Sequence, residues 1–308
     1  MPDDVAFLVN PASANGSTGR RWPELARRAA AAGIDGKALV SERPGHVAEL
    51  AARAAADGTR LLVVVGGDGT VHEAVNGLLR VTHAETELAV LPRGTGGDFA
   101  RTHRIPTDLE RALGTVRDGR ARRVDAGLAR YRTWDGSAAQ SYFAQFAGAG
   151  ISGAIARRAN SASKALGGRV SFMVATVAVF AGWKSENVAV TVDDDERHGR
   201  MFEVLVTIGE HAAGGMWVTP GASPSDELFD VLLIGDVTKA DFVRTFPKIY
   251  RGTHLAHPKV DVLRGRRVEV EAATALPIAL DGEQPGTTPA AFEIVPAAFS
   301  VRVPAEAD

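Results

Sequence analysis

A continuous run of leucine and valine at residues 61–65 passes directly into the glycine-rich segment Gly66-Gly67-Asp68-Gly69-Thr70. An unbroken apolar run of this length is typical of a strand buried on both faces of a parallel sheet. The following residues, 71–79, are expected to form a helix. Glycines let a ligand approach the backbone closely, and the free N–H groups at a helix start favour phosphate. The segment therefore predicts an α/β fold whose sheet edge carries an anion-binding loop.

The first 125 residues alternate between expected strands and helices. Pro23 lies near the expected start of the first helix, and Gly33 lies at its end. Alternation of this kind predicts an α/β domain with a parallel sheet. The expected strands cover residues 5–9, 61–65 and 88–91, and the expected helices cover residues 24–32, 45–56 and 71–79.

Two more expected strands also end in polar segments. Asn10-Pro11-Ala12-Ser13 follows the first strand, and the segment 92–101 follows the strand at 88–91 with glycines, a hydroxyl and a carboxylate. Since parallel strands end at the same edge of a sheet, these segments are expected to line one crevice with the Gly66–Thr70 loop. Asp68 does not favour a bare phosphate, but a magnesium ion between the two would explain it.

The pattern changes near Asp125, after which alternating, strand-like segments and turn signals dominate. Helices are expected only near residues 168–183 and 239–250, with Pro247 shortening or kinking the second. We expect residues 126–297 to form an antiparallel, β-sandwich-like domain. Without a low-complexity linker, the cleft between the two domains is the expected ligand site.

A set of motifs in this order along nearly the whole chain resembles the diacylglycerol kinase catalytic domain family, which includes soluble bacterial lipid kinases and sphingosine kinases. The motifs are Asn10-Pro11-x-Ser13, Gly66-Gly67-Asp68-Gly69-Thr70 with Glu73 and Asn76-Gly77, Gly94-Thr95-Gly96-x-Asp98-Phe99-Ala100-Arg101, Asp125-x-Gly127, Gly148-x-Gly150, Gly214-Gly215-Met216, Pro220-x-Ala222, Asp226 and Asp281-Gly282-Glu283.

The resemblance implies an ATP- and Mg²⁺-dependent kinase that phosphorylates a lipid hydroxyl. By this analogy residues 298–308 return to the first domain. The implied nucleotide-binding residues are Asn10, Pro11, Ala12, Ser13, Ala14, Ser41, Gly66, Gly67, Asp68, Gly69, Thr70, Val71, His72, Glu73, Gly94, Thr95 and Asp98. The implied metal ligands are Asp68, Asp98 and Asp125 near the phosphates, and Ser223, Asp226 and Leu228 at a structural magnesium site.

Glu283 matches the family's general base, and with Asp68 it is the expected catalytic residue. Phosphoryl transfer depends mainly on positioning and charge neutralisation, which magnesium and loop N–H groups supply. A base is still useful because the attacking alcohol must lose its proton.

Several positions differ from the common family pattern. They are Gly97, Gln145, Ser152, Gly209-Glu210 and Glu227. The nucleotide loops are otherwise intact, so these differences bear mainly on the identity of the lipid and on the Asp226 metal site.

Composition narrows the partners. The formal net charge is -2 among 308 residues, so no global field favours nucleic acid, and there are no cysteines. The acidic start predicts no signal peptide, and a cytoplasmic protein is expected. The apolar run at 170–183 is too short to span a bilayer. It fits a buried core helix, but Lys164 and Arg169 leave open a helix beside a membrane surface.

Alternatives to a lipid kinase stay open. The Gly-Gly-Asp-Gly loop also occurs in NAD kinases and phosphofructokinases, although NAD kinases are expected to carry an Asn-x-Glu element where this chain has residues 94–98. A kinase for a soluble alcohol and a non-catalytic nucleotide- or lipid-binding regulator are the other two. The lipid itself, membrane contact at the surface and a homodimer are not decided by the sequence.

Overall fold

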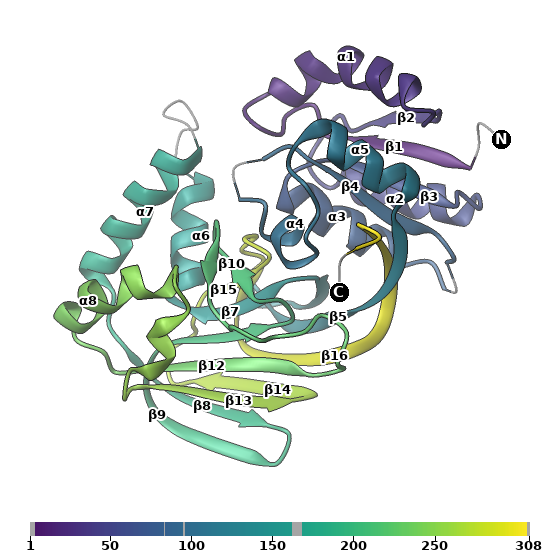
Figure 1. Ribbon diagram of the computed structural model, residues 1–308. Helices are drawn as coiled ribbons and strands as arrows, with labels where there is room; N and C mark the ends of the chain where they lie inside the picture. The colour runs from purple at the N-terminus through teal and green to yellow at the C-terminus, as the bar shows by residue number, and fades with distance from the viewer. Residues whose placement is uncertain (1–3, 83, 95, 162–167, 307–308) are drawn as a thin grey trace. The chain divides into compact units, whose positions relative to one another are not determined.

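The computed structural model describes residues 4–306 except 83, 95 and 162–167 (Figure 1). The chain divides into two compact units, Met1–Val124 with Ala297–Asp308, and Asp125–Pro296. The predicted fold class is confirmed: the first unit is an α/β domain around parallel strands, and the second is rich in antiparallel strands. Within the described ranges, no helix is long and apolar enough to cross a membrane.

The sheet of the first unit has the strand order β4-β3-β1-β2, and all four strands are parallel. The central strand β3 is buried at every position, as its leucine and valine run predicts. Ser300 and Val301 of β16 add parallel pairing to β4. The strands are β1 (Val5–Val9), β2 (Lys37–Val40), β3 (Leu61–Gly66) and β4 (Glu87–Pro92).

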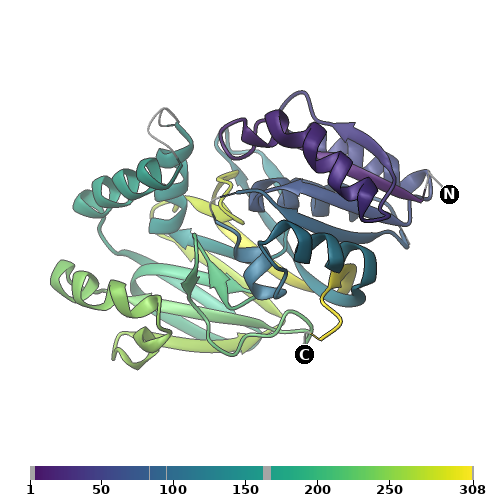
Figure 2. The same ribbon diagram turned by 45° about the horizontal axis from the view of Figure 1, so that its top comes forward.

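Helices flank this sheet, as Figure 2 shows. They are α1 (Ser17–Ala31), α2 (His46–Ala56), α3 (Asp68–Leu78), α4 (Asp98–Thr102) and α5 (Leu109–Asp118).

Two helix starts differ from the expectation. α1 begins at Ser17, so Pro23 lies inside the helix rather than in its first turn. α3 begins at Asp68 after the N-cap Gly67, so Asp68, Gly69 and Thr70 form its first turn instead of a loop. The expected stop at Gly33 is confirmed, since its positive φ of 78° suits a residue that follows a helix end.

The second unit has the strand order β13-β12-β9-β8-β14-β16, joined by antiparallel pairs; β7 also pairs with β9, and β15 with β7. Its core includes Phe143, which packs against the rings of Phe229 and Phe292 at 5.8 and 6.0 Å. The strands are β5 (Arg120–Thr133), β6 (Ala138–Phe143), β7 (Phe146–Gly150), β8 (Glu186–Val192), β9 (Asp195–Thr207), β10 (His211–Ala212), β11 (Met216–Trp217), β12 (Phe229–Gly235), β13 (Val260–Gly265), β14 (Arg267–Ala272), β15 (Ile278–Leu280) and β16 (Gly286–Val303).

Three helices accompany these strands. They are α6 (Ile151–Ser161), α7 (Gly168–Gly182) and α8 (Lys239–Ile249). The sequence predicted the last two and missed α6.

Candidate functional site

The ends of three neighbouring parallel strands meet at one edge of the first unit, as expected. The side-chain amide of Asn10, after β1, donates a 3.2 Å hydrogen bond to the hydroxyl of Thr70 in α3. The backbone N–H of Arg93, after β4, donates to the carbonyl of Gly66 at 2.7 Å. The segments that follow β1, β3 and β4 therefore form one connected site.

Glycine is required where the two main loops touch. A Cβ atom on Gly94 would lie 2.8 Å from the Cα of Gly67, closer than real Cβ contacts allow. The shared glycines thus permit a backbone-to-backbone approach that places the start of α3 beside the loop after β4. The first N–H groups of a helix have no intrahelical partner, so this position suits a phosphate group.

Asp68 links the same two segments through its side chain. One carboxylate oxygen accepts a 2.7 Å hydrogen bond from the N–H of Gly97, and the other accepts a 3.1 Å bond from the N–H of Phe99. Phe99 lies in the first turn of α4, so the carboxylate of one helix start stabilises the N-terminus of another.

A pair of carboxylates converges beside Gly96. A Cβ on Gly96 would lie 2.3 Å from Oδ2 of Asp68 and 3.9 Å from Oδ2 of Asp98. Asp98 is buried and forms a 3.1 Å ion pair with Arg101. Magnesium commonly binds one or two carboxylates and completes its shell with water and substrate phosphates, so this oxygen pair fits the ion.

Positive charge also lies near this edge. The pKa of Arg93 is below the usual arginine value because of partial burial and then because of the nearby cations Arg21 and Arg28. Arginines in this range remain charged at neutral pH. The loops are therefore accompanied by cations that favour an anionic ligand.

In the second unit, Glu283 lies on a tight hairpin turn between β15 and β16. Leu280 and Glu283 exchange two backbone hydrogen bonds of 2.8 Å. The two residues between them, Asp281 and Gly282, have φ values of 49° and 92°, which is the geometry of a type I′ turn. Glu283 itself is exposed.

Asp281 fixes that turn to the rest of the unit. Its carboxylate accepts hydrogen bonds from the N–H groups of Ala144, Gln145 and Phe146 at 2.8, 2.9 and 3.1 Å. Its own N–H donates to the carbonyl of Phe146 at 2.9 Å. Asp281 thus acts as the anchor that holds the Glu283 turn in one geometry, a role that the sequence did not reveal.

Two family models match this chain in succession. The diacylglycerol kinase catalytic domain matches residues 4–129. The YegS C-terminal NAD kinase beta sandwich-like domain matches residues 145–303, more than half of the chain. The chain belongs to the diacylglycerol kinase catalytic domain family.

Curated relatives in this family carry the name diacylglycerol kinase. The protein from Staphylococcus saprophyticus subsp. saprophyticus is 26% identical over 292 residues, covering 95% of this chain and 92% of the relative. The protein from Bacillus subtilis is 27% identical over 287 residues, covering 93% and 91%.

Solved structures show the same fold. A diacylglycerol kinase from Bacillus anthracis superposes with a TM-score of 0.74 at 22% identity, covering 99% of this chain and 98% of the other. Yeast NADH kinase, in complex with NADH, superposes with a TM-score of 0.54 at 10% identity, covering 97% and 82%. At these identities the likeness concerns the fold alone.

Other residues that the family resemblance assigns to the nucleotide have mainly internal contacts. Ser13 donates to the carbonyl of Asn10 at 2.9 Å, and Ser41 is buried beside the end of β1. The carboxylate of Glu73 accepts a 3.2 Å hydrogen bond from the N–H of Val47 at the start of α2. Thr95 lies outside the described residues.

The family's Gly-x-Gly motif makes room for a carboxylate that the sequence analysis overlooked. A Cβ on Gly148 would lie 2.8 Å from Glu203, and one on Gly150 would lie 2.9 Å from it. Glu203 is buried and accepts hydrogen bonds of 2.7 and 2.6 Å from the N–H and hydroxyl of Ser152, at the start of α6. Burial, partly offset by these bonds, raises its pKa to about 7.

Gln145 is also unusual. Its side chain is buried, and neither its amide nitrogen nor its carbonyl oxygen has a hydrogen-bond partner within the described part of the chain. A buried amide normally finds a partner, so Gln145 marks a polar position beside the Asp281 anchor.

The residues expected at the structural magnesium site do not fit a metal ion in this structure. The guanidinium of Arg264, on β13, forms ion pairs with Asp226 and, at 3.1 Å, with Asp230. Asp226 also accepts a 3.3 Å bond from the N–H of Leu228. Within the described ranges, no group of three or more His, Asp or Glu side chains could hold a metal.

Asp125 connects to the same loop. Its N–H donates to the carbonyl of Pro224 at 2.8 Å, and its carboxylate accepts a 2.8 Å bond from the N–H of Glu227. Glu227 has a φ of 62°, which explains why glycine is common at this position in the family. Ser223 lies in the same loop.

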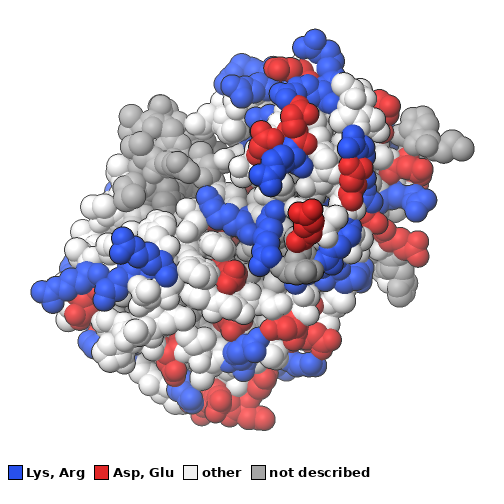
Figure 3. Space-filling model, in the orientation of Figure 1, with Lys and Arg blue, Asp and Glu red and all other residues white. Residues whose placement is uncertain are grey.

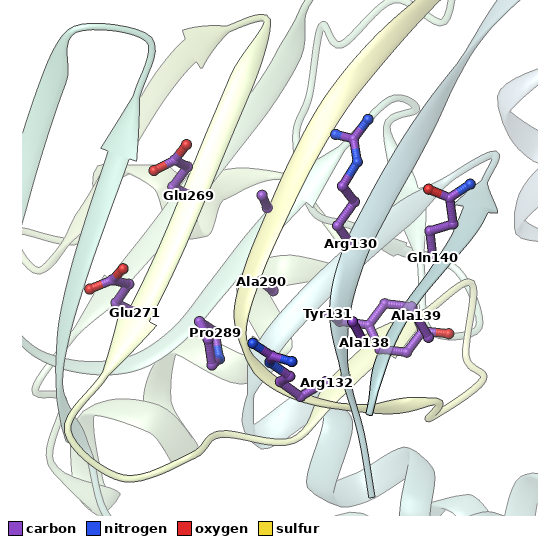
Figure 4. A pocket seen from close by; sticks show the side chains of 11 residues that line it. Arg130, Tyr131, Arg132, Ala138, Ala139, Gln140, Glu269, Glu271, Pro289 and Ala290 are labelled. Atoms are coloured by element: carbon purple, nitrogen blue, oxygen red, sulfur yellow. The ribbon is translucent and has the colours of Figure 1, made fainter. Parts of the chain in front are cut away.

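A surface groove of about 450 Å³ crosses strands of the second unit (Figure 4). Arg130 and Arg132 of β5 line one side, and Glu269 and Glu271 of β14 line the other. None of the expected site residues lines this groove, so it is not the site that the family resemblance indicates.

Proposed function

We propose that this protein transfers the γ-phosphate of ATP to a hydroxyl group of diacylglycerol or a related lipid. The observation that carries the proposal is the side-chain link from Asp68 to Gly97 and Phe99, which joins the two phosphate-type loops. Such an arrangement prepares backbone N–H groups and carboxylates together for a nucleotide and its metal ion. The names of the curated relatives support the same activity.

In this proposal the nucleotide is held by the segments after β1, β3 and β4. The residues are those that the family resemblance assigns, including Thr95 and Ser41. Backbone N–H groups at the start of α3 and the side chain of Asn10 orient the phosphates, and Arg93 adds positive charge. Asp68 and Asp98, together with Asp125 directly or through water, would hold magnesium, whose charge would neutralise the phosphate oxygens.

Glu283 is proposed as the general base. Its carboxylate accepts the proton of the lipid hydroxyl as the hydroxyl oxygen forms a bond to the γ-phosphorus. The bond between that phosphorus and the β,γ-bridging oxygen breaks, and ADP leaves. Asp281 keeps Glu283 positioned during this step, since its carboxylate is fixed by the three N–H groups of residues 144–146.

The experiment is a transfer assay with labelled ATP and a panel of acceptors. Diacylglycerol, a sphingoid base and a ceramide are offered in mixed micelles, and NAD and glycerol are offered in solution. Label in a lipid supports the proposal and names the lipid. Label in NAD or glycerol instead would assign the other kinase classes, and the absence of any magnesium-dependent turnover would favour a non-catalytic regulator.

A further inference from the structure

α7 exposes apolar side chains where the sequence suggested a core helix. Residues 170–182 contain no charged side chain. Yet Val174 is 57% exposed and Val177 is 61% exposed, and they lie three residues apart on one helix face. Lys164 and the side chain of Arg169 lie outside the described residues.

α8 is a well-defined helix with the same property. Thr238 and Asp241 form a capping box at its start. None of its residues is buried, and Val243 is 61% exposed. Tyr250, directly after the helix, is 47% exposed.

The two helices lie side by side, as Figures 1 and 2 both show. The ring of Phe180 in α7 stacks on Phe242 in α8 with centroids 4.3 Å apart, and Phe242 in turn stacks on Phe246 at 5.2 Å. Lys239 donates a hydrogen bond to the carbonyl of Ala181. The aromatic side chains hold the helices together, while the valines remain on the surface.

The exposed cations of α8 are unpaired. Arg244, Lys248 and Arg251 are exposed and form no ion pair with any carboxylate that the structure describes. Elsewhere in the second unit, arginines such as Arg130 and Arg200 pair with acidic side chains. Figure 3 shows lysine and arginine side chains gathered where α8 lies.

We propose that this α7–α8 surface, formed by Val174, Val177, Val243, Arg244, Lys248, Tyr250 and Arg251, docks onto an anionic phospholipid bilayer. The choice of a bilayer rests on the proposed function, since a lipid acceptor is delivered there, and on charge complementarity. The apolar side chains enter the interface and the cations contact lipid phosphates, a combination typical of peripheral membrane helices. A tyrosine at the edge suits the boundary between lipid and water.

The test measures binding of the full-length protein to vesicles of phosphatidylcholine with or without phosphatidylglycerol. The cation variant is Arg244→Glu, Lys248→Glu and Arg251→Glu, and the apolar variant is Val174→Ser, Val177→Ser and Val243→Ser. A control of equal charge change is Arg130→Glu, Arg197→Glu and Arg267→Glu, on strands of the same unit.

The wild type and the control are expected to bind phosphatidylglycerol vesicles. At about one factor of ten per cation, the cation variant is expected to bind at least about 100-fold more weakly. The apolar variant is expected to bind about tenfold more weakly. Binding that both variants retain, or that the control loses equally, would overturn the proposal. A vesicle-independent dimer that both variants abolish would assign the surface to a second copy instead.

A second readout separates this proposal from the proposed function. With a short-chain diacylglycerol dissolved as monomers and no vesicles, the variants are expected to turn over ATP as the wild type does. If no protein phosphorylates any lipid but the variants still lose vesicle binding, the docking surface stands and the kinase assignment fails.

Discussion

The carboxylate of Asp68 accepts a 2.7 Å hydrogen bond from the backbone N–H of Gly97, a residue on a different loop. Because a second bond reaches Phe99, the start of α3 and the start of α4 form one bonded unit before any ligand is present. This link explains why an acidic side chain is placed beside a phosphate-type loop. It gives Asp68 a structural role in addition to the proposed role with magnesium.

Replacing Gly96 by alanine is expected to break this unit. The new Cβ would lie 2.3 Å from the Asp68 carboxylate, so the loop must move away from α3. We expect at least a tenfold loss of ATP affinity, measured by calorimetric titration in the presence of magnesium. Gly114→Ala is the control, since a Cβ there meets nothing within 4 Å and alanine favours the helix. Equal ATP affinity in the two variants would show that the contact is unimportant.

Replacing Arg264 by glutamine is expected to destabilise the Asp226 loop. Two carboxylates, Asp226 and Asp230, would lose their shared cation, at a cost of about 1 kcal/mol in unfolding free energy. Magnesium without nucleotide is expected to raise the melting temperature of this variant and to leave that of the wild type unchanged. A magnesium response of the wild type that Asp226→Asn removes would instead favour a structural metal site.

Glu203 is expected to make the fold less stable as the pH rises. Its pKa is about 7 in the folded state and 4.5 in the reference state, so its protonated form is favoured by folding. The contribution is fully present below pH 4.5 and is lost as the pH rises through 7, a change on the order of 3 kcal/mol. Glu203→Gln is expected to remove this slope in denaturant unfolding measured at a series of pH values. An unchanged slope would mean that another group causes it.

His103 is expected to act in the opposite direction. Burial, with a smaller effect of Arg122, lowers its pKa from 6.5 to about 3. Its stabilising contribution is present above pH 6.5 and is lost as the pH falls towards 3. His103 stacks on Phe99 at 4.3 Å, so His103→Phe keeps an aromatic ring there. This variant is expected to unfold at lower pH than the wild type in acid titrations, and unfolding at the same or a higher pH would contradict the assignment.

Local patterns predicted much of the first unit. The buried strand β3 and the glycine segment after it follow from residues adjacent in sequence, as does the stop of α1 at Gly33. The start of α1 was missed because Pro23 was taken as a first-turn residue, whereas proline here is tolerated inside the helix.

Contacts between distant residues were not predictable in the same way. Glu203 bonds to Ser152, 51 positions away, and only the pairing of β7 with β9 brings them together. The Gly148-x-Gly150 motif was visible, but the carboxylate that requires its glycines was not. Likewise, the apolar run in α7 predicted burial, because composition does not show which face of a helix a neighbour covers.

The most direct test of the account is the transfer of label from γ-labelled ATP to diacylglycerol in mixed micelles, comparing the wild type with Glu283→Gln. The substitution leaves the Asp281 anchor in place, so the fold and ATP affinity are expected to remain unchanged. We expect magnesium-dependent formation of labelled phosphatidic acid by the wild type, and a kcat that is about 10²- to 10⁴-fold lower in the variant. A variant as fast as the wild type would contradict the assignment of Glu283, and a folded wild type that labels no lipid would contradict the account as a whole.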